Sequence, residues 1–291
     1  MINYDGVLCI DEATFLRLPV IDTSVPLTVY GVGERIKAVV DKLYKLYGDV
    51  EVCADDKTVR LSDIEHAERI SPPAQPDFDK KRYNAVDAIR VMNRLMQKEG
   101  GCPWDSVQTH ESIRVNLIEE AYEAVDAIDT HDLNGMREEF GDVLLQSLLQ
   151  SAIARRDGEF DFDDVCDELC KKLISRHTFI FGDDNAAGAG DAITLWDKNK
   201  AKEKNYASVK DQLQRLPEEF PSLLRCQKAY KKIKKSGAPT DMFELGSKIE
   251  NGDYAAAIAA LTAKLSDEGK DAEVELNRVV RDIVKGLPGD K

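Results

Sequence analysis

Apolar side chains recur at helical spacing almost without interruption from Tyr83 onward. Asp132 and Asp161 stand where helix N-caps are expected, and Gly100-Gly101 stands where the first helix should stop. A chain with this pattern is expected to be mostly α, with helices that each bury one apolar stripe. The spacing predicts helices over about 83–98, 110–129, 132–156, 162–176 and 191–204, then a mostly helical tail over 206–291.

Residues 1–76 follow a different pattern. The segments VPLTVYGV (25–32) and DVEVCA (49–54) are typical of short strands, and the segment between them (34–48) has helical spacing with Gly48 as a stop. This order predicts a small α/β or α+β domain. Three prolines in SPPAQPDFDK (71–80) indicate an extended linker. We therefore expect three parts, at 1–76, 77–205 and 206–291.

The charge balance limits the partners of this chain. Its 40 basic and 54 acidic residues give a net charge of −14, which argues against stable binding to nucleic acid. A small polyanionic substrate would need metal ions or a local basic cluster. No apolar run approaches a membrane span, and no secretory signal is evident. Six scattered cysteines without a Cys-x-x-Cys pattern indicate reduced thiols, so we expect a cytoplasmic protein without a membrane partner.

Two acidic pairs occupy matching positions on neighbouring predicted helices. Glu120 and Glu123 are spaced i,i+3, as are Glu139 and Asp142, so each pair lies on one helical face. The two helices are joined by a turn centred on His131. Glu120 precedes this turn by as many residues as Asp142 follows it, and the same holds for Glu123 and Glu139. In an antiparallel hairpin, both pairs would therefore lie at the same height.

Four carboxylates converging between packed helices would repel one another unless cations lay between them. A cluster that offers only oxygen atoms favours a hard cation, Mg²⁺ with Mn²⁺ as the alternative. Another interpretation places these acids on a solvated outer face, although an apolar stripe borders Glu120 instead of lying opposite it. A di-iron site would need Glu-x-x-His on two helices, which EAYE and EFGD do not supply. The stripe consists of Ile113, Leu117, Ala121, Val125 and Ile128.

Six sequence blocks follow one another within 83–204: GCPWDSVQTHES (101–112), LIEEAYEAVDAI (117–128), REEFGDVLLQSLL (137–149), DGEFDFDDV (157–165), KKLISRHTFIFGD (171–183) and WDKNKAKEK (196–204). In this order they resemble the blocks of MazG-type nucleoside triphosphate pyrophosphohydrolases. This resemblance implies an all-α, usually dimeric enzyme that uses Mg²⁺ to hydrolyse nucleoside triphosphates to the monophosphate and pyrophosphate.

The resemblance also implies roles for the acids. The EExxE…ExxD motif of the family holds the metal, and it maps onto Glu120, Glu123, Glu139 and Asp142. Glu119 matches the first glutamate of the motif and shares a helical face with Glu123. The resemblance therefore implies that Glu119 is an outer ligand or orients the attacking water.

Five further residues are implied to bind the substrate. Lys172 and Arg176 match the basic residues of the family near the end of the fourth helix, where they can offer a point charge and a bidentate fork to phosphate. Trp196 and Lys200 match a later Trp and Lys, and Trp104 could stack on a base. Without the resemblance, the basic pair is also explained by the helix C-terminus, and a lone Trp is more often a core residue.

The chain departs from the family in two blocks. RHTFIFG (176–182) lacks the Pro and the second His of the family, so the role of His177 stays open. LPEEFPSLLRCQKAYKKIKKSGAP (216–239) resembles the start of a second MazG-like unit, but both acidic motifs are lost after it. We expect 206–291 to be a degenerate helical unit without a metal centre, serving for dimerisation or capping.

Three stretches of residues 5–75 are DGVLCIDEATFL (5–16), PLTVYGVGERIKAVVDKLYKLYGDVEV (26–52) and LSDIEHAERISPPA (61–74). Together they resemble the closing part of the tetrapyrrole methyltransferase domain that is fused to MazG units in some bacteria. The glycine-rich methyl-donor site is absent, and Gly31-Val32-Gly33 alone does not replace it, so we expect a remnant without methyltransferase activity. The whole sequence thus predicts a Mg²⁺-dependent pyrophosphohydrolase that acts on nucleoside triphosphates and forms a homodimer or higher homo-oligomer. The alternative is a catalytically silent helical scaffold or regulatory protein with the same fold.

Overall fold

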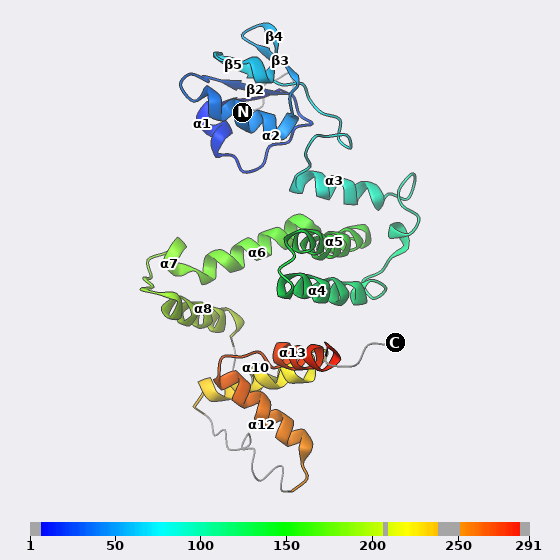
Figure 1. Ribbon diagram of the computed structural model, residues 1–291, viewed down its shortest axis with the longest axis vertical. Coiled ribbons are helices and arrows are strands. Elements are labelled where there is room, and N and C mark those ends of the chain that lie inside the picture. Colours follow the sequence, from blue (N-terminus) through cyan, green and yellow to red (C-terminus); the bar gives the residue numbers. More distant parts are fainter. Residues whose placement is uncertain (1–6, 206–208, 238–250, 286–291) are drawn as a thin grey trace. The chain divides into compact units, whose positions relative to one another are not determined.

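The computed structural model describes residues 7–205, 209–237 and 251–285. It divides into two compact units, Met1–Cys170 and Lys171–Lys291, and the division falls within one helix. All strands of the described residues lie in the first 71 positions, and helices dominate the remainder (Figure 1). The expected fold class, mostly α with a small N-terminal α/β domain, is confirmed. The three-part division at residues 76 and 205 stays a prediction.

The N-terminal residues form a five-stranded sheet in the order β1-β2-β5-β3-β4. Within the described part of the chain, β1 pairs with β2 in parallel and the other strand pairs are antiparallel. Helices α1 (Glu12–Arg17) and α2 (Ile36–Tyr47) contribute Phe15, Val39 and Leu43 to the sheet core. Gly48 ends α2 at a φ of 75°, as the sequence predicted. The strands are β1 (Leu8–Asp11), β2 (Leu27–Tyr30), β3 (Glu51–Ala54), β4 (Lys57–Arg60) and β5 (Arg69–Ser71), with a 3-10 turn at Leu61–Asp63.

A buried ion pair connects the linker to the first long helix, α3 (Ala85–Leu95). The Nζ of Lys80 lies 2.6 Å from an Oδ1 of Asp87, and neither side chain is more than 1% exposed. Arg90 binds Asp22 of the N-terminal domain at 2.5 Å and lowers the pKa of that carboxyl. These charges fix the start of α3 against the N-terminal domain. The predicted helix over 83–98 is therefore shorter than expected, because Asn84 caps it and it ends before Gly100.

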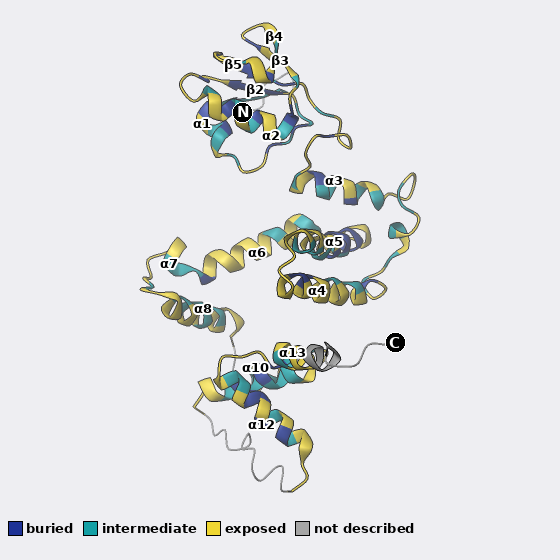
Figure 2. Ribbon diagram, viewed as in Figure 1, coloured by how far each residue is buried: buried dark blue, intermediate teal, exposed yellow. Residues whose placement is uncertain are grey.

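The next two helices, α4 (Arg114–Asp129) and α5 (Leu133–Asp157), form an antiparallel hairpin. His131 adopts a φ of 57° at the turn, and Asp132 accepts hydrogen bonds from the backbone N–H groups of Asn134 and Gly135. The predicted turn and N-cap are thus confirmed, although α4 begins four residues later than the predicted start at residue 110. The C-terminal half of α5 is buried beneath α3, whereas α4 is largely exposed (Figure 2).

The expectation that the apolar stripe of α4 would be buried is mostly wrong. Ile113 is buried at 1% exposure, but Leu117, Val125 and Ile128 are 42–45% exposed. The residues of α4 that are buried are Ala124 and Ala127, because small side chains allow the backbones of α4 and α5 to approach closely. The larger apolar residues therefore face away from the hairpin.

Helix α6 (Phe162–Arg176) is capped by Asp161, whose Oδ1 accepts from the N–H groups of Asp163 and Asp164, as predicted. Within the second unit, α10 contacts both α12 and α13. All six cysteines are free thiols. Among the described residues, no helix has the length and apolar character to cross a membrane. The remaining helices are a 3-10 turn at Asp105–Val107, α7 (Thr178–Phe181), α8 (Ala189–Lys204), α9 (Val209–Gln214), α10 (Ser222–Lys235), α12 (Tyr254–Asp267) and α13 (Ala272–Lys285).

Candidate functional site

The α4–α5 hairpin brings three carboxylates together. Glu120 and Glu123 come from α4 and Glu139 comes from α5, and each offers an oxygen within 4.8 Å of the others. The matching heights predicted around His131 are therefore present in the structure for these three residues. A cluster of this kind forms because two i,i+3 pairs on antiparallel helices face each other across the same level.

The electrostatics of the cluster show that it carries excess negative charge. Partial burial raises the pKa of Glu120, and repulsion by Asp142 and Glu123 raises it further. Burial likewise raises the pKa of Glu139, together with repulsion by Glu123 and Asp142. Asp142, the fourth predicted acid, is thus coupled to both helices. Glu119 is exposed and acts on Glu120 by like-charge repulsion.

One oxygen of the cluster is buried without compensation. The Oε2 atom of Glu139 is shielded from solvent and has no hydrogen-bond partner among the described residues. Buried polar atoms are normally paired, because an unpaired one loses its hydration without replacement. An all-oxygen donor set with an orphaned carboxylate oxygen fits a hard divalent cation, which would satisfy the oxygen and offset the repulsion.

A second group of predicted residues lies in the other unit, around Arg176. The Nε and Nη2 atoms of Arg176 each donate to Glu203 at 2.9 Å, and the Arg176 side chain is only 6% exposed. The guanidinium lies 5.2 Å from the ring of Trp196, and His177 meets that ring edge-on at 4.7 Å. Arg176 and Trp196 are thus brought together, and the fork of Arg176 is held by a carboxylate.

Sequence reasoning missed Glu203 as the partner of Arg176. Its carboxyl has a lowered pKa, chiefly because it accepts hydrogen bonds from Arg176. The available signal was a glutamate near the end of the block WDKNKAKEK, but its pairing with a residue 27 positions earlier depends on tertiary packing. The side chain of His177, whose role the sequence left open, is held by its Nδ1 atom, which lies 2.7 Å from the carbonyl oxygen of Leu173.

The other predicted substrate residues differ in exposure. Lys172 is exposed on α6, and Lys200 is half-buried on α8. Trp104 is 58% exposed in the loop that precedes α4. That loop is fixed to α5, because the Nη1 atom of Arg156 donates to the carbonyl oxygens of Ser106 at 3.1 Å and Gln108 at 2.9 Å. Trp104 is therefore a solvent-facing ring on an anchored loop.

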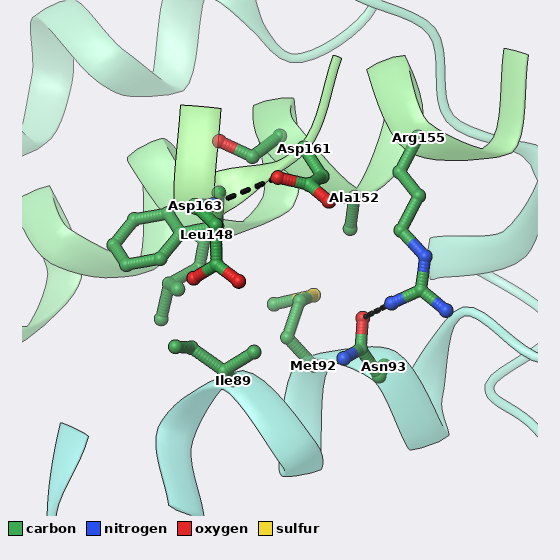
Figure 3. A pocket seen from close by; sticks show the side chains of 10 residues that line it. Ile89, Met92, Asn93, Leu148, Ala152, Arg155, Asp161 and Asp163 are labelled. Carbon is green, nitrogen blue, oxygen red and sulfur yellow. Dashed lines mark hydrogen bonds between the residues drawn. The ribbon is translucent and has the colours of Figure 1, made fainter. Parts of the chain in front are cut away.

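A small cavity lies between α3, α5 and the start of α6 (Figure 3). Its wall is formed by Ile89, Met92 and Leu148, and its rim carries a hydrogen bond of 2.8 Å from Arg155 to Asn93. Its volume is about 120 Å³. Ligand pockets usually enclose roughly 300–1,000 Å³, so we assign no ligand to this cavity.

Comparison with known families matches residues 108–181 to the MazG nucleotide pyrophosphohydrolase domain. The matched segment contains the acidic hairpin together with Lys172 and Arg176. The chain is 35% identical over 155 residues to the nucleoside triphosphate pyrophosphohydrolase of Escherichia coli K12, covering 53% of this chain and 59% of that protein. The segment that matches the MazG domain is thus the one that forms the helical hairpin with converging carboxylates. The chain belongs to the MazG family.

The chain is also similar to three further proteins. A nucleoside triphosphate pyrophosphohydrolase/pyrophosphatase MazG of Thermotoga maritima is 44% identical over 118 residues, covering 40% of this chain and 44% of that protein. An uncharacterized 26.1 kDa protein of Streptomyces cacaoi is 32% identical over 217 residues, covering 73% and 86%. The solved structure of a mazG-related protein from Thermotoga maritima aligns at 26% identity with a TM-score of 0.35, over 40% of this chain and 98% of that one. The chain spans about 59% of the length of the Escherichia coli relative.

Proposed function

We propose that the chain is a Mg²⁺-dependent nucleoside triphosphate pyrophosphohydrolase. It would hydrolyse ribo- or deoxynucleoside triphosphates, standard or damaged, to the monophosphate and pyrophosphate. The observation that carries this proposal is the convergence of Glu120, Glu123 and Glu139, with one orphaned oxygen, in the segment that matches the MazG domain. The relatives named for this activity support it.

In this proposal Glu120, Glu123, Glu139 and Asp142 hold Mg²⁺, or Mn²⁺ as the alternative. The bound ion would supply charge neutralisation for the triphosphate and a lowered pKa for a water molecule. Glu119 acts as an outer ligand or orients the attacking water toward the α-phosphorus. These five acids are the catalytic residues. Their positions suit a reaction that depends on placement and charge more than on covalent help from the protein.

The proposed substrate contacts are made by the basic and aromatic residues. Lys172 offers a point charge to a phosphate oxygen, and Lys200 adds a second ammonium. Arg176 would offer its guanidinium to a phosphate oxygen while its Nε and Nη2 atoms donate to Glu203, or in exchange for that pair. Trp196 and Trp104 stack on the base. These roles follow from the family motif, and each can be tested by replacing the residue with one of similar shape.

We also propose that two or more copies of the chain associate. Large apolar side chains of α4 and α5 are exposed, including Ile118 at 56% and Phe140 at 50%. Monomeric proteins rarely expose large contiguous apolar patches, so this face is expected to be covered by a second copy. In this proposal residues 1–76 are a methyltransferase-like remnant without activity. Residues 206–291 are a degenerate unit that caps or extends the homo-oligomer. The enzyme is proposed to be cytoplasmic.

The proposal is tested by product analysis on a panel of standard and modified nucleoside triphosphates, with and without Mg²⁺. We expect equal amounts of monophosphate and pyrophosphate, formed only with the metal. Release of inorganic phosphate instead of pyrophosphate would contradict the reaction class. A folded protein that neither releases pyrophosphate nor is stabilised by Mg²⁺ would support the scaffold alternative, because a bound ligand stabilises the native state.

A further inference from the structure

The inner face of the α4–α5 hairpin consists of paired levels, as the spacing about His131 predicted. Gly135 follows His131 by as many residues as Ala127 precedes it, and a Cβ placed on Gly135 would lie 3.4 Å from the Cβ of Ala127. At the far end of the contact, Ile113 and Leu149 are equally distant from His131 and belong to one buried cluster. The register therefore holds along the whole contact between the two helices (Figure 1).

Two amide side chains occupy the level next to the acidic cluster. Asn116 precedes Glu120 by four residues on α4, and Gln146 follows Asp142 by four residues on α5. Residues spaced i,i+4 share a helical face and are about 6 Å apart along the axis, so each amide lies one turn from an acid. Asn116 and Gln146 are also equally distant from His131, which places them at one level of the hairpin.

Gln146 is buried with an acceptor unpaired. The residue is 5% exposed, and its Oε1 atom has no hydrogen-bond partner among the described residues. The Oε2 atom of Glu139 is in the same state. Seven residues make about two turns, so both orphaned oxygens belong to the same face of α5. Buried acceptors are normally paired, and two unpaired ones on one face indicate that a bound species supplies what the chain does not.

A hydrated divalent cation satisfies both oxygens. The ion itself would bind the Glu139 carboxylate, and Mg²⁺ keeps several of its water molecules, which donate hydrogen bonds to nearby acceptors. A carboxamide oxygen accepts such a bond without adding charge. At Gln146 this matters, because a further carboxylate beside Asp142 would add to the repulsion that already raises the pKa of Glu120 and of Glu139.

We propose that Gln146 is a positioning residue for the cation, whose Oε1 accepts a hydrogen bond from a water molecule of the hydration shell. Asn116 offers a second amide at the same level. The inference rests on the proposed function, in which the acids of the hairpin hold Mg²⁺. It adds that part of the metal affinity comes from an uncharged residue outside the EExxE…ExxD motif.

The test combines isothermal titration calorimetry of the full chain with Mg²⁺ and melting curves of the metal-free protein. Gln146→Met replaces the amide with an apolar side chain of similar shape. We expect it to weaken Mg²⁺ binding about tenfold or more, because residues that hold the ligands of a metal typically contribute at least that factor. The metal-free variant should melt at or above the temperature of the parent, since an unpaired buried oxygen is removed.

Gln227→Met is the matched control, because Gln227 is equally buried, at 2% exposure, but is paired. Its Nε2 donates to the carbonyl oxygen of Lys270 at 2.7 Å, and its Oε1 accepts from the N–H of Ala272 at 3.4 Å. This substitution leaves two backbone groups without their partner. It should therefore lower the metal-free melting temperature and leave the Mg²⁺ affinity unchanged.

Glu123→Gln separates this inference from the proposed function. If the parent binds Mg²⁺, Glu123→Gln loses it and Gln146→Met binds as tightly as the parent, the role of Gln146 is overturned and the proposed function stands. Weaker Mg²⁺ binding by Gln146→Met together with a lower metal-free melting temperature would show a structural role and would also overturn it. A parent that binds no Mg²⁺, or a Glu123→Gln protein that binds it as the parent does, would overturn both proposals.

Discussion

At the scale of single residues, the carboxylates of the acidic cluster repel one another. Glu120 and Glu139 have raised pKa values because both are partly shielded from water and face other carboxylates. The sequence predicted this convergence because the spacing of four acids around a short turn depends only on helix geometry. It did not predict that Glu139 would keep an oxygen both buried and unpaired, since burial depends on the packed environment.

Glu139→Gln should stabilise the metal-free protein and abolish its stabilisation by Mg²⁺. Removing one repelled carboxylate should raise the melting temperature by about 1–3 °C, while loss of a metal ligand removes the ligand-dependent gain. Differential scanning fluorimetry in metal-depleted buffer and with Mg²⁺ measures both effects. Glu168→Gln, an exposed glutamate on α6, is the control and should change neither. A metal-free protein destabilised by Glu139→Gln, with its Mg²⁺ response intact, would contradict this view.

The same repulsion predicts a pH dependence. A glutamate whose folded pKa lies above its ordinary value of 4.5 binds more protons when folded, so metal-free stability falls as pH rises through that interval. Glutamine mimics the protonated form, so the advantage of Glu139→Gln should be near zero at about pH 4 and should grow toward neutral pH. Melting curves of the two proteins across this range measure the difference. A difference that does not change with pH would contradict the electrostatic explanation.

At the scale of elements, the hairpin was predictable and its packing was not. The positions of His131 and Asp132 set the turn and the start of α5 through local backbone preferences, which a sequence displays directly. The apolar stripe of α4 predicted the wrong buried face, because a stripe that meets a partner chain has the same spacing as one that meets the core. The small residues Ala124 and Ala127 decided the contact with α5 instead.

Among the ion pairs of the described residues, the buried pair of Lys80 and Asp87 at the start of α3 should contribute most to the free energy of unfolding. Asp87→Asn removes the nearer carboxylate of the buried Lys80 ammonium and leaves Asp22 at 3.6 Å, and we expect a loss of about 3 kcal/mol in the free energy of unfolding. Asp77→Asn is the matched control, because Asp77 is 51% exposed and 3.7 Å from Arg90, and it should cost less than about 1 kcal/mol. Urea unfolding measures both. Equal losses in the two variants would show that burial does not set the cost.

At the scale of the whole molecule, exposed apolar surface points to association. Val125 and Ile128 lie on the outer side of α4 at 45% and 42% exposure, away from the hairpin contact. The sequence could not place the lysines of α10 beside Lys200 of α8, because no local pattern reports contacts between distant helices. The exposed apolar face of α4 is likewise defined only once the helices are packed.

Ile128→Lys should convert the assembly to monomers. A charge placed in an apolar interface loses its hydration without gaining a partner, and a lysine in the last turn of α4 remains compatible with the helix. Sedimentation velocity of the parent chain and the variant measures the change. Val107→Lys, at a 70% exposed apolar residue in the loop before α4, is the control and should leave the assembly intact. A parent chain that sediments as a monomer would contradict the expected association.

The most direct test of the central claim is pyrophosphate release by the parent chain, Glu123→Gln and Glu168→Gln over a Mg²⁺ titration. If the acids of the α4–α5 hairpin hold the catalytic metal, Glu123→Gln should lower the rate by about a hundredfold or more at any Mg²⁺ concentration, because phosphoryl transfer depends on the metal for charge neutralisation. Glu168→Gln should retain the parent rate. A folded Glu123→Gln protein that releases pyrophosphate as fast as the parent would show that the reaction takes place elsewhere.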